Sequence, residues 1–140
     1  MMDPYNSDGR YSGQFTGFMK LHLWSLIEYD KVLYFDIDLL FRRPVDELLE
    51  TPYDFGAARD DGYSVQTLNY KFNSGLMVLR PSLKTYAELM HAYATRIATY
   101  DGADQGFLQT FFQNKTIWRI PNKYNTLRRR EQFVDVTQVV

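Results

Sequence analysis

The most apolar block of the chain runs from Lys31 to Phe41 and reads KVLYFDIDLLF. Its β-branched and aromatic residues predict a buried strand. Asp36 and Asp38 lie near the end of this block, one residue apart. Burying carboxylates is unfavourable unless a cation lies beside them. The pattern therefore predicts a strand whose end holds a cation, and our working hypothesis is a divalent metal that carries the phosphates of a nucleotide.

The segment before this strand is dense in apolar residues from Thr16 to Glu28. It predicts a helix that begins with Thr16 as its N-cap and is covered on several sides. Lys20 is the exception among these apolar positions, and its ammonium group either reaches the surface along its flexible stem or faces an anion. Residues 1–15 are polar and rich in turn formers, so we expect a flexible leader there, with Arg10 as its only basic residue.

The remainder of the chain alternates between strand and helix patterns. We expect a helical turn at 45–50, strands at 55–58, 76–79 and 116–120, and helices at 83–97 and 104–112. Ser82 is the predicted N-cap of the first of these helices. The apolar stripe expected on that helix comprises Leu83, Tyr86, Ala87, Met90, Ala94 and Ile97. This order of elements predicts an α/β sandwich.

Length and composition restrict the classes of function. The 140 residues fit one domain, with 45% hydrophobic and 24% charged residues, as in ordinary globular proteins. A net charge of −1 provides no basic field, so we expect no nucleic-acid partner. The chain has no cysteine, which excludes disulfides, thiolate metal sites and cysteine nucleophiles. No apolar run approaches the roughly 18 residues of a membrane span, so none is expected in this chain.

Asp36 and Asp38 would lie on the same side of the chain if the strand stayed extended, because side chains alternate along a strand. Two carboxylates on one side form a hard oxygen site that suits magnesium or manganese. The carboxyl end of a parallel strand is also where α/β sheets bind ligands. The alternative is a turn at the end of the strand that carries two solvated aspartates.

A second polar cluster, Asn73 and Ser74 followed by Gly75, stands before a predicted strand. It either forms a tight turn or presents an amide and a hydroxyl group to sugar hydroxyls, with Gly75 allowing a ligand to approach the backbone. His22 and His91 lie within predicted helices, and neither is at ligand spacing from another histidine or a carboxylate. We interpret both histidines as structural.

A third cluster, Asp101, Asp104 and Gln105, stands where one predicted helix ends and the next begins. Asp104 is either an N-cap or first-turn residue of the second helix, or part of a pair of carboxylates that faces a reacting carbon atom. The basic run at 128–130 either contacts a phosphate or belongs to a solvated tail.

Five motifs follow one another in the sequence: KLHLWSL at 20–26, VLYFDIDLL at 32–40, FNSGLMVLRPS at 72–82, DGADQGFLQTFF at 101–112 and IPNKYNTL at 120–127. Together they resemble the glycogenin-like branch of the family-8 glycosyltransferases. The resemblance implies a Rossmann-like nucleotide-diphospho-sugar transferase fold of the GT-A type. It also implies transfer of a sugar from a nucleotide sugar, usually a UDP-sugar, to an acceptor with retention of the anomeric configuration.

The resemblance assigns the metal and the nucleotide to the first half of the chain. Asp36 and Asp38 would be the D-x-D motif that holds manganese, or magnesium, on the diphosphate of the UDP-sugar. Ile37 would lie between them against the ribose and uridine through its backbone. Lys20 would be the family's helix lysine near the donor.

The resemblance assigns the sugar to the second half of the chain. Asn73 and Ser74 would bind the donor sugar. Asp101, Asp104 and Gln105 would line the sugar and acceptor side of the reaction centre. The acceptor would be a carbohydrate, a polyol or a protein. A homodimer is a further expectation. The compartment stays open between the cytoplasm and the Golgi lumen, because the N-terminal segment that would decide it is expected to be missing.

Two parts of the family pattern are not found in this sequence. The first strand with its base-binding segment would precede residue 1, and the H-x-x-G-x-x-K-P-W motif, whose histidine supplies the third metal ligand, does not occur. We therefore expect an internal fragment with N-terminal strand-helix units missing, a partial catalytic core at 16–127 and a tail at 128–140. The alternative function is a truncated or degenerate transferase-like module that binds without turnover.

Two other activities are not expected. Phosphatases of the haloacid-dehalogenase type also place D-x-D after an apolar strand, but Leu39 and Leu40 follow the motif here, and no later lysine or paired-aspartate motif of that class follows in order. Self-glucosylation needs an acceptor tyrosine after the K-Y-N turn, and no tyrosine follows Tyr124.

Overall fold

A computed structural model describes residues 14–60 and 71–126 of the chain. Its strands are β1 (Val32–Phe35), β2 (Phe55–Arg59), β3 (Phe72–Leu79) and β4 (Trp118–Ile120). Its α-helices are α1 (Leu83–Ala94) and α2 (Asp104–Phe112), and its 3₁₀ helices are η1 (Gln14–Ser25), η2 (Asp46–Glu50) and η3 (Asn122–Tyr124). The predictions for Arg10, for the leader as far as residue 13 and for the tail at 128–140 lie outside the described residues.

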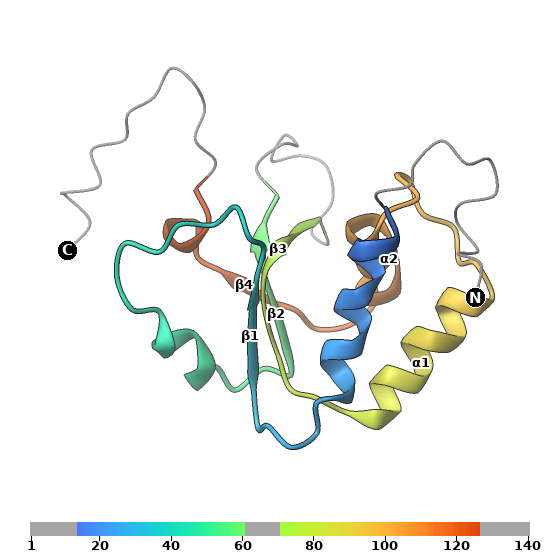
Figure 1. Cartoon of the computed structure of the whole chain (residues 1–140), viewed down its shortest axis with the longest axis horizontal. Coiled ribbons are helices and arrows are strands. Elements are labelled where there is room, and N and C mark those ends of the chain that lie inside the picture. The colour runs from blue at the N-terminus through green and yellow to red at the C-terminus, as the bar shows by residue number, and fades with distance from the viewer. Residues whose placement is uncertain (1–13, 61–70, 127–140) are drawn as a thin grey trace.

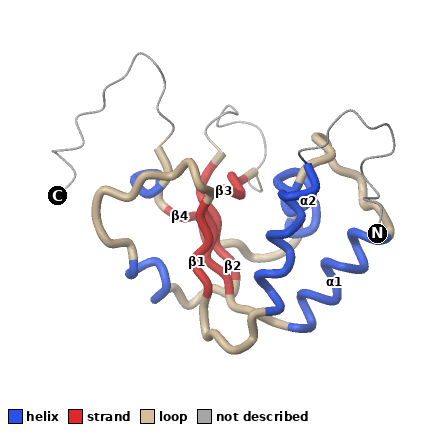
Figure 2. The backbone as a smooth tube through the Cα atoms, in the orientation of Figure 1, coloured by secondary structure: helices blue, strands red, loops and turns tan. Residues whose placement is uncertain are grey.

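The four described strands form one mixed sheet in the order β1-β3-β2-β4. β3 pairs antiparallel with both β1 and β2, and β4 pairs parallel with β2. Helices η1, α1 and α2 lie on one side of the sheet, and η2 and η3 lie on the other (Figures 1 and 2). This layered arrangement confirms the predicted α/β class.

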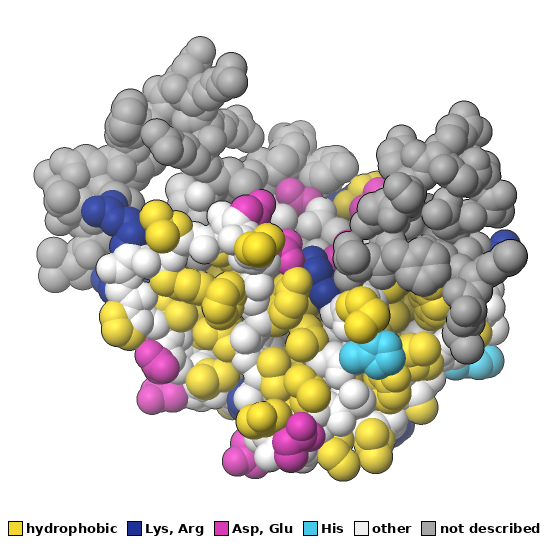
Figure 3. Space-filling model, viewed as in Figure 1, with side chains coloured by type: hydrophobic (Ala, Val, Ile, Leu, Met, Phe, Trp, Pro, Cys, Tyr) yellow, Lys and Arg dark blue, Asp and Glu magenta, His cyan; other side chains and the backbone are white. Residues whose placement is uncertain are grey.

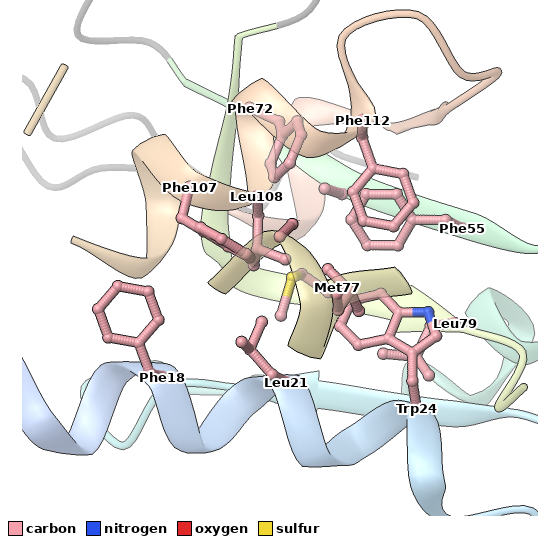
Figure 4. Packing of buried hydrophobic residues seen from close by; sticks show 13 residues of the cluster. Phe18, Leu21, Trp24, Phe55, Phe72, Met77, Leu79, Phe107, Leu108 and Phe112 are labelled. Atoms are coloured by element: carbon pink, nitrogen blue, oxygen red, sulfur yellow. The ribbon is translucent and has the colours of Figure 1, made fainter. Parts of the chain in front are cut away.

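The larger hydrophobic core lies between the sheet and helices η1, α1 and α2 (Figure 4). Phe18, Leu21 and Trp24 of η1 point into it and are each at least 93% buried, with exposed fractions of 7%, 1% and 1%. Their spacing of three residues places them on one face, because side chains three apart eclipse in a 3₁₀ helix. Burial of such a side chain contributes roughly 1.5–3 kcal/mol, so this face fixes η1 on the sheet.

Two details of the prediction for η1 were wrong. Thr16 is not the N-cap, because the helix already includes Gln14. The helix is also covered on one side rather than several, since Met19 is 64% exposed. The three-residue period of its buried side chains leaves the remaining positions near the solvent.

A smaller core fills the opposite face of the sheet, beneath η2 and η3. Leu76 and Val78 of β3 point into it, whereas Met77 and Leu79 point into the larger core. This division follows from the alternation of side chains along a strand. β3 is therefore buried on both faces, which explains its unbroken apolar sequence after Gly75.

The predicted first residues of the two helices after β3 are confirmed: α1 begins at Leu83 and α2 at Asp104. The backbone N–H of Thr85 donates to Ser82 Oγ at 3.3 Å, so Ser82 caps α1 as expected. α1 ends at Ala94 rather than at residue 97, and Arg96 just beyond it has a positive φ of 54°. The buried side chains of α1 are Leu89 and Ala92, which the expected stripe did not include. Of that stripe, Tyr86 and Ile97 pack half-buried against the larger core, whereas Leu83 is exposed. α2 has the predicted bounds.

Candidate functional site

Lys20 lies at the centre of a charged cluster that joins three elements. Its Nζ atom is 3.1 Å from Asp36 Oδ1, at the end of β1, and 2.9 Å from Asp104 Oδ2, at the start of α2. The Lys20 side chain is only 10% exposed. Of the two alternatives for this lysine, the structure therefore supports the one in which the ammonium group faces anions. Two carboxylates share one cation, so the three side chains together carry a net negative charge.

Ser74 completes this cluster from β3. Lys20 Nζ donates to Ser74 Oγ at 3.3 Å, and Ser74 Oγ donates to Asp104 Oδ2 at 2.9 Å. Lys20, Asp36, Ser74 and Asp104, which we call the Lys20 cluster, thus bring together four of the predicted site residues. They come from η1, the end of β1, β3 and α2.

The second polar cluster lies inside a strand rather than before one. β3 begins at Phe72, and its pairing with β2 shifts so that Ala57 lies opposite Met77 while Ala58 lies opposite Asn73. Of the two alternatives for this cluster, the tight turn before the strand is not found, because these residues belong to β3 and lie at an irregularity of its pairing with β2. Such irregularities, or bulges, re-aim side chains and often occur beside active sites.

Side chains satisfy the backbone groups of this bulge. The N–H of Ser74 donates to Gln105 Oε1 at 3.1 Å, and the N–H of Gly75 donates to Asn73 Oδ1 at 2.8 Å. Asn125 Nδ2 also donates to Asn73 Oδ1, at 3.2 Å. Buried backbone N–H groups need a partner, so these amides hold the bulge in place.

The two aspartates of the D-x-D motif do not continue a strand. β1 ends at Phe35, and Asp36 opens a turn in which the N–H of Leu39 donates to Asp36 O at 3.1 Å. Aspartate is favoured at the first position of such a turn. The strand predicted at 31–41 was therefore too long. Because the chain turns at Asp36, no extended strand places the Asp36 and Asp38 side chains on one side.

The environment of the motif also differs from that of a parallel strand. β1 pairs with β3 in the antiparallel sense, and the Asp36 N–H donates to Gly75 O at 2.8 Å just beyond that pairing. Asp38 is exposed, and Ile37 and Leu40 in the following loop are 102% and 86% exposed. Hydrophobic side chains are frequent on the face of the molecule drawn in Figure 3. The side chains of Ile37, Asp38 and Leu40 in the loop after β1 are thus exposed.

Sequence reasoning did not identify Tyr34 as part of the site. Its hydroxyl group donates to Asp36 Oδ1 at 2.7 Å. Burial raises the pKa of Tyr34, and the hydrogen bond to Asp36 and the charges of Asp36, Asp104 and Asp38 raise it further. The phenol is therefore a neutral hydrogen-bond donor. Its position two residues before Asp36, which would put both side chains on one face of an extended strand, was the available signal.

Asp101 does not join the Lys20 cluster. Its Oδ1 accepts from the N–H of Ala103 at 2.9 Å, and its Oδ2 accepts from the N–H of Gly106 at 3.1 Å. It therefore satisfies two backbone donors at the start of α2. A Cβ atom on Gly106 would lie 2.1 Å from Asp101 Oδ1, so this contact requires glycine.

Gln105 uses both ends of its amide group within the protein. Besides accepting from Ser74, it donates from Nε2 to Asp60 Oδ2 at 3.1 Å and to Tyr100 Oη at 3.4 Å. His22 contacts Tyr86 Oη through Nδ1 at 2.9 Å on the exposed side of η1. Gln105 therefore holds the backbone of β3 at Ser74. His22 links η1 to α1.

Two side-chain oxygens, Asp36 Oδ2 and Asn73 Oδ1, pack against the backbone at Gly75 beside the Lys20 cluster. A Cβ atom at this position would lie 3.0 Å from Asp36 Oδ2 and 2.7 Å from Asn73 Oδ1. Carboxylate and amide oxygens are ligands of the kind that Mg²⁺ and Mn²⁺ prefer. Among the described residues, no three His, Cys, Asp or Glu side chains gather into one metal-binding group. The donors present fit an ion that takes one or two protein carboxylates and obtains its other ligands from phosphate and water.

None of the helices in the described part of the chain has the length and apolar character needed to cross a bilayer.

Comparison with known proteins gives consistent matches. The sequence profile of Glycosyl transferase family 8 matches residues 8–132. The chain is 42% identical over 108 residues to glycogenin-1 of Caenorhabditis elegans, which covers 76% of this chain and 23% of that protein. It is 40% identical over 95 residues to human glycogenin-1, covering 68% of this chain and 25% of that protein.

A plant transferase matches the same part of the chain. The UDP-glucuronate:xylan alpha-glucuronosyltransferase 1 of Arabidopsis thaliana is 39% identical over 112 residues, covering 79% of this chain and 15% of that protein. The chain thus spans about a quarter or less of the length of these curated relatives.

Proposed function

Because the chain belongs to Glycosyl transferase family 8, we propose that it transfers a sugar from a UDP-sugar to an acceptor hydroxyl group, with retention of the anomeric configuration. The family has the GT-A fold, and the mixed α/β sandwich is consistent with a Rossmann-like domain of that type, as the sequence predicted. The observation that supports this function most is the convergence of Lys20, Asp36, Ser74 and Asp104 from four separate elements.

The proposal places the donor diphosphate beside the end of β1. Asp36 and Asp38 would hold manganese or magnesium there, and such an ion stabilises the negative charge of the departing UDP when it is bound. Lys20 adds a fixed positive charge next to the same carboxylate, at 3.1 Å from Asp36 Oδ1. A preorganised cation at a site of developing negative charge lowers the energy of the transition state.

The proposal places the sugar between the bulge of β3 and the start of α2. Ser74 and Asn73 would bind sugar hydroxyl groups, since both present polar atoms beside Gly75. The Asp104 carboxylate is held by Lys20 and by the Ser74 hydroxyl. It would stabilise the oxocarbenium-like character of the reacting carbon, either as a transient nucleophile or electrostatically.

Asp101 and Gln105 have a supporting role in this proposal. Asp101 fixes the first turn of α2, which carries Asp104, through its bonds to Ala103 and Gly106. Gln105 fixes the backbone of Ser74. Both therefore line the reaction centre by positioning the side chains that we expect to contact the sugar.

The names of the relatives suggest which donors and acceptors to test. Glycogenins and a UDP-glucuronate:xylan glucuronosyltransferase both match this chain. We infer from the second name that UDP-glucuronic acid and a carbohydrate acceptor are the first pair to examine. UDP-glucose as donor, and polyol and protein hydroxyl groups as acceptors, come next on the basis of the sequence resemblance to the glycogenin-like branch.

Release of UDP from these donors in the presence of Mn²⁺ tests the proposal. We expect release by the chain, and its loss in Asp36→Asn, which keeps the size of the side chain but removes its charge. Asp54→Asn is the matched control, because Asp54 pairs with Arg80 on an exposed part of the surface and should leave release unchanged.

One result would count against transfer, and another would count against the site. Manganese-dependent UDP binding without release would support the alternative of a binding module without turnover. Release that persists in Asp36→Asn would contradict the assignment of the site.

A further inference from the structure

We propose that Tyr34 is a positioning residue that holds the Asp36 carboxylate so that Oδ2, rather than Oδ1, is offered to the divalent cation. The inference rests on the proposed function, because it concerns the same cation. Tyr34 lies outside the D-x-D motif, two residues before Asp36.

The two oxygens of Asp36 have different surroundings. Oδ1 accepts from the Tyr34 hydroxyl group at 2.7 Å and lies 3.1 Å from Lys20 Nζ. Oδ2 has a longer contact, of 3.4 Å, with the same Lys20 atom. Because Oδ1 already accepts two close donors, its remaining capacity for a cation is small, and Oδ2 is the oxygen with capacity left.

Asp36 Oδ2 lies close to the backbone of Gly75, and only a residue without a side chain allows this approach. A Cβ atom at this position would lie 3.0 Å from Asp36 Oδ2, closer than nearly all real contacts of this kind. The same Cβ would lie 2.7 Å from Asn73 Oδ1. Two oxygens therefore flank a backbone position without a side chain, while the Tyr34 hydroxyl group contacts the other oxygen of Asp36.

Tyr34 is itself held firmly. It pairs with Met77 in the register of β1 and β3, and its ring packs against the larger core. The ring also lies below Lys20, with Nζ 5.2 Å from its centroid. The packing of the ring therefore fixes the position of the hydroxyl group, so that this group can orient a metal-binding carboxylate. Hydrogen-bond partners of ligating carboxylates typically contribute about 10- to 100-fold to metal affinity.

A purely structural role for the hydroxyl group predicts different behaviour from a positioning role. If the bond between Tyr34 and Asp36 only satisfies a half-buried phenol, its removal changes thermal stability and leaves manganese affinity alone. If the bond orients Asp36, its removal changes manganese affinity while the packed ring preserves the fold. Tyr34→Phe separates these cases, because it removes the hydroxyl oxygen and keeps the ring.

The experiment measures Mn²⁺ binding by the chain in the presence of UDP, using the electron paramagnetic resonance signal of free Mn²⁺. We expect Tyr34→Phe to weaken Mn²⁺ binding by about 10- to 100-fold, as for other hydrogen-bonded metal ligands. Tyr86→Phe is the matched control, because it removes a tyrosine hydroxyl that bonds to His22 instead. The control should bind Mn²⁺ as the unmodified chain does, and equal affinity in Tyr34→Phe would overturn the inference.

A second variant tests the other side of Asp36. Gly75→Ala introduces the Cβ atom next to Oδ2, so it should also weaken Mn²⁺ binding with Tyr34 intact. Unchanged Mn²⁺ affinity in Gly75→Ala would overturn the assignment of Oδ2, even if Tyr34→Phe failed to fold.

The same measurements distinguish the inference from the function on which it rests. If the unmodified chain binds no Mn²⁺ in the presence of UDP, the proposed metal site fails and the inference fails with it. If the unmodified chain binds Mn²⁺ and releases UDP, but Tyr34→Phe needs no more Mn²⁺ for half-maximal release, only the inference fails. The expected result is a higher Mn²⁺ requirement with release restored at saturating Mn²⁺.

Discussion

Two acidic motifs of this chain have similar sequences but different structural roles. The D-x-D motif follows β1 and the D-x-x-D motif opens α2. In each motif one carboxylate binds Lys20, namely Asp36 at 3.1 Å and Asp104 at 2.9 Å. The other aspartate of each motif does something else: Asp38 is exposed to solvent, and Asp101 binds the backbone of α2.

The difference arises from the backbone beside each motif rather than from the carboxylates. Both motifs approach a glycine, but Gly106 donates its N–H to the Asp101 carboxylate, whereas Gly75 accepts from the backbone N–H of Asp36 and leaves the Asp36 carboxylate to Lys20 and Tyr34. A carboxylate that binds backbone N–H groups is committed to the fold. A carboxylate that shares a lysine with a second carboxylate retains capacity for another cation. The comparison teaches that burial and partners, rather than motif membership, identify the residues available to a ligand.

The largest expected effect comes from removing the cation that both motifs share. Lys20→Met leaves the Asp36 and Asp104 carboxylates without their ion pair. We expect a loss of about 3 kcal/mol in the free energy of unfolding, at the lower end of the range for buried pairs, because the Asp36 side chain is 36% exposed. Denaturant unfolding measures the effect. Lys84→Met on the exposed surface of α1 is the control. Equal stability of both variants would contradict the claim that the ion pairs of Lys20 stabilise the fold.

The next effect concerns the glycine of the second motif. Gly106→Ala places a Cβ atom 2.1 Å from Asp101 Oδ1 and must displace that carboxylate. We expect a net loss of about 1–2 kcal/mol, because the lost capping and the steric conflict outweigh the helix propensity that alanine adds. Thermal unfolding measures the loss, and Mn²⁺ affinity should not change. A variant that loses Mn²⁺ binding at native stability would show that the two motifs are not separate.

A smaller effect is expected from Asp101 itself. Asp101→Ala removes the acceptor of the Ala103 and Gly106 N–H groups. The expected loss is about 1 kcal/mol, the usual contribution of a capping side chain. Chemical denaturation of the variant measures it, with Asp38→Ala as the comparison in the other motif. Because Asp38 is exposed, its replacement should leave stability close to that of the unmodified chain, and a reversed order would refute the comparison.

The smallest effect is expected from an ion pair outside both motifs. Asp54 and Arg80 lie 3.0 Å apart, with side chains that are 82% and 51% exposed. Exposed pairs contribute about 0–1 kcal/mol, so Asp54→Asn should change the free energy of unfolding by less than about 0.5 kcal/mol. Urea unfolding provides the value. A larger change would mean that the greater exposure of this ion pair does not make it weaker than the ion pairs of Lys20.

The sequence predicted the local elements better than the contacts between them. The bounds of α2 and the cap at Ser82 follow from local chemistry, since capping and helix periodicity depend on neighbouring residues. The length of β1 was overestimated because the apolar run continues through the turn at Asp36. In such a turn the hydrogen bond from Leu39 competes with the extended strand.

The site required information that no local pattern contains. The D-x-D motif and the Asp101–Gln105 segment were identified as candidates. Their shared contact with Lys20 depends on how η1 packs on the sheet, which the sequence does not specify. The bulge in β3 depends on the register with β2, which sequence periodicity does not specify. Tyr34 was missed because an apolar strand position with an aromatic residue is usually part of the core.

The most direct test of the account is a calorimetric titration of the chain with UDP and Mn²⁺, repeated for Asp36→Asn and Asp101→Asn. Both substitutions remove one carboxylate charge and preserve side-chain size. The account predicts that Asp36→Asn abolishes Mn²⁺-dependent UDP binding, whereas Asp101→Asn binds UDP as before with a lower melting temperature. Retained binding in Asp36→Asn, or equal loss in both variants, would contradict it.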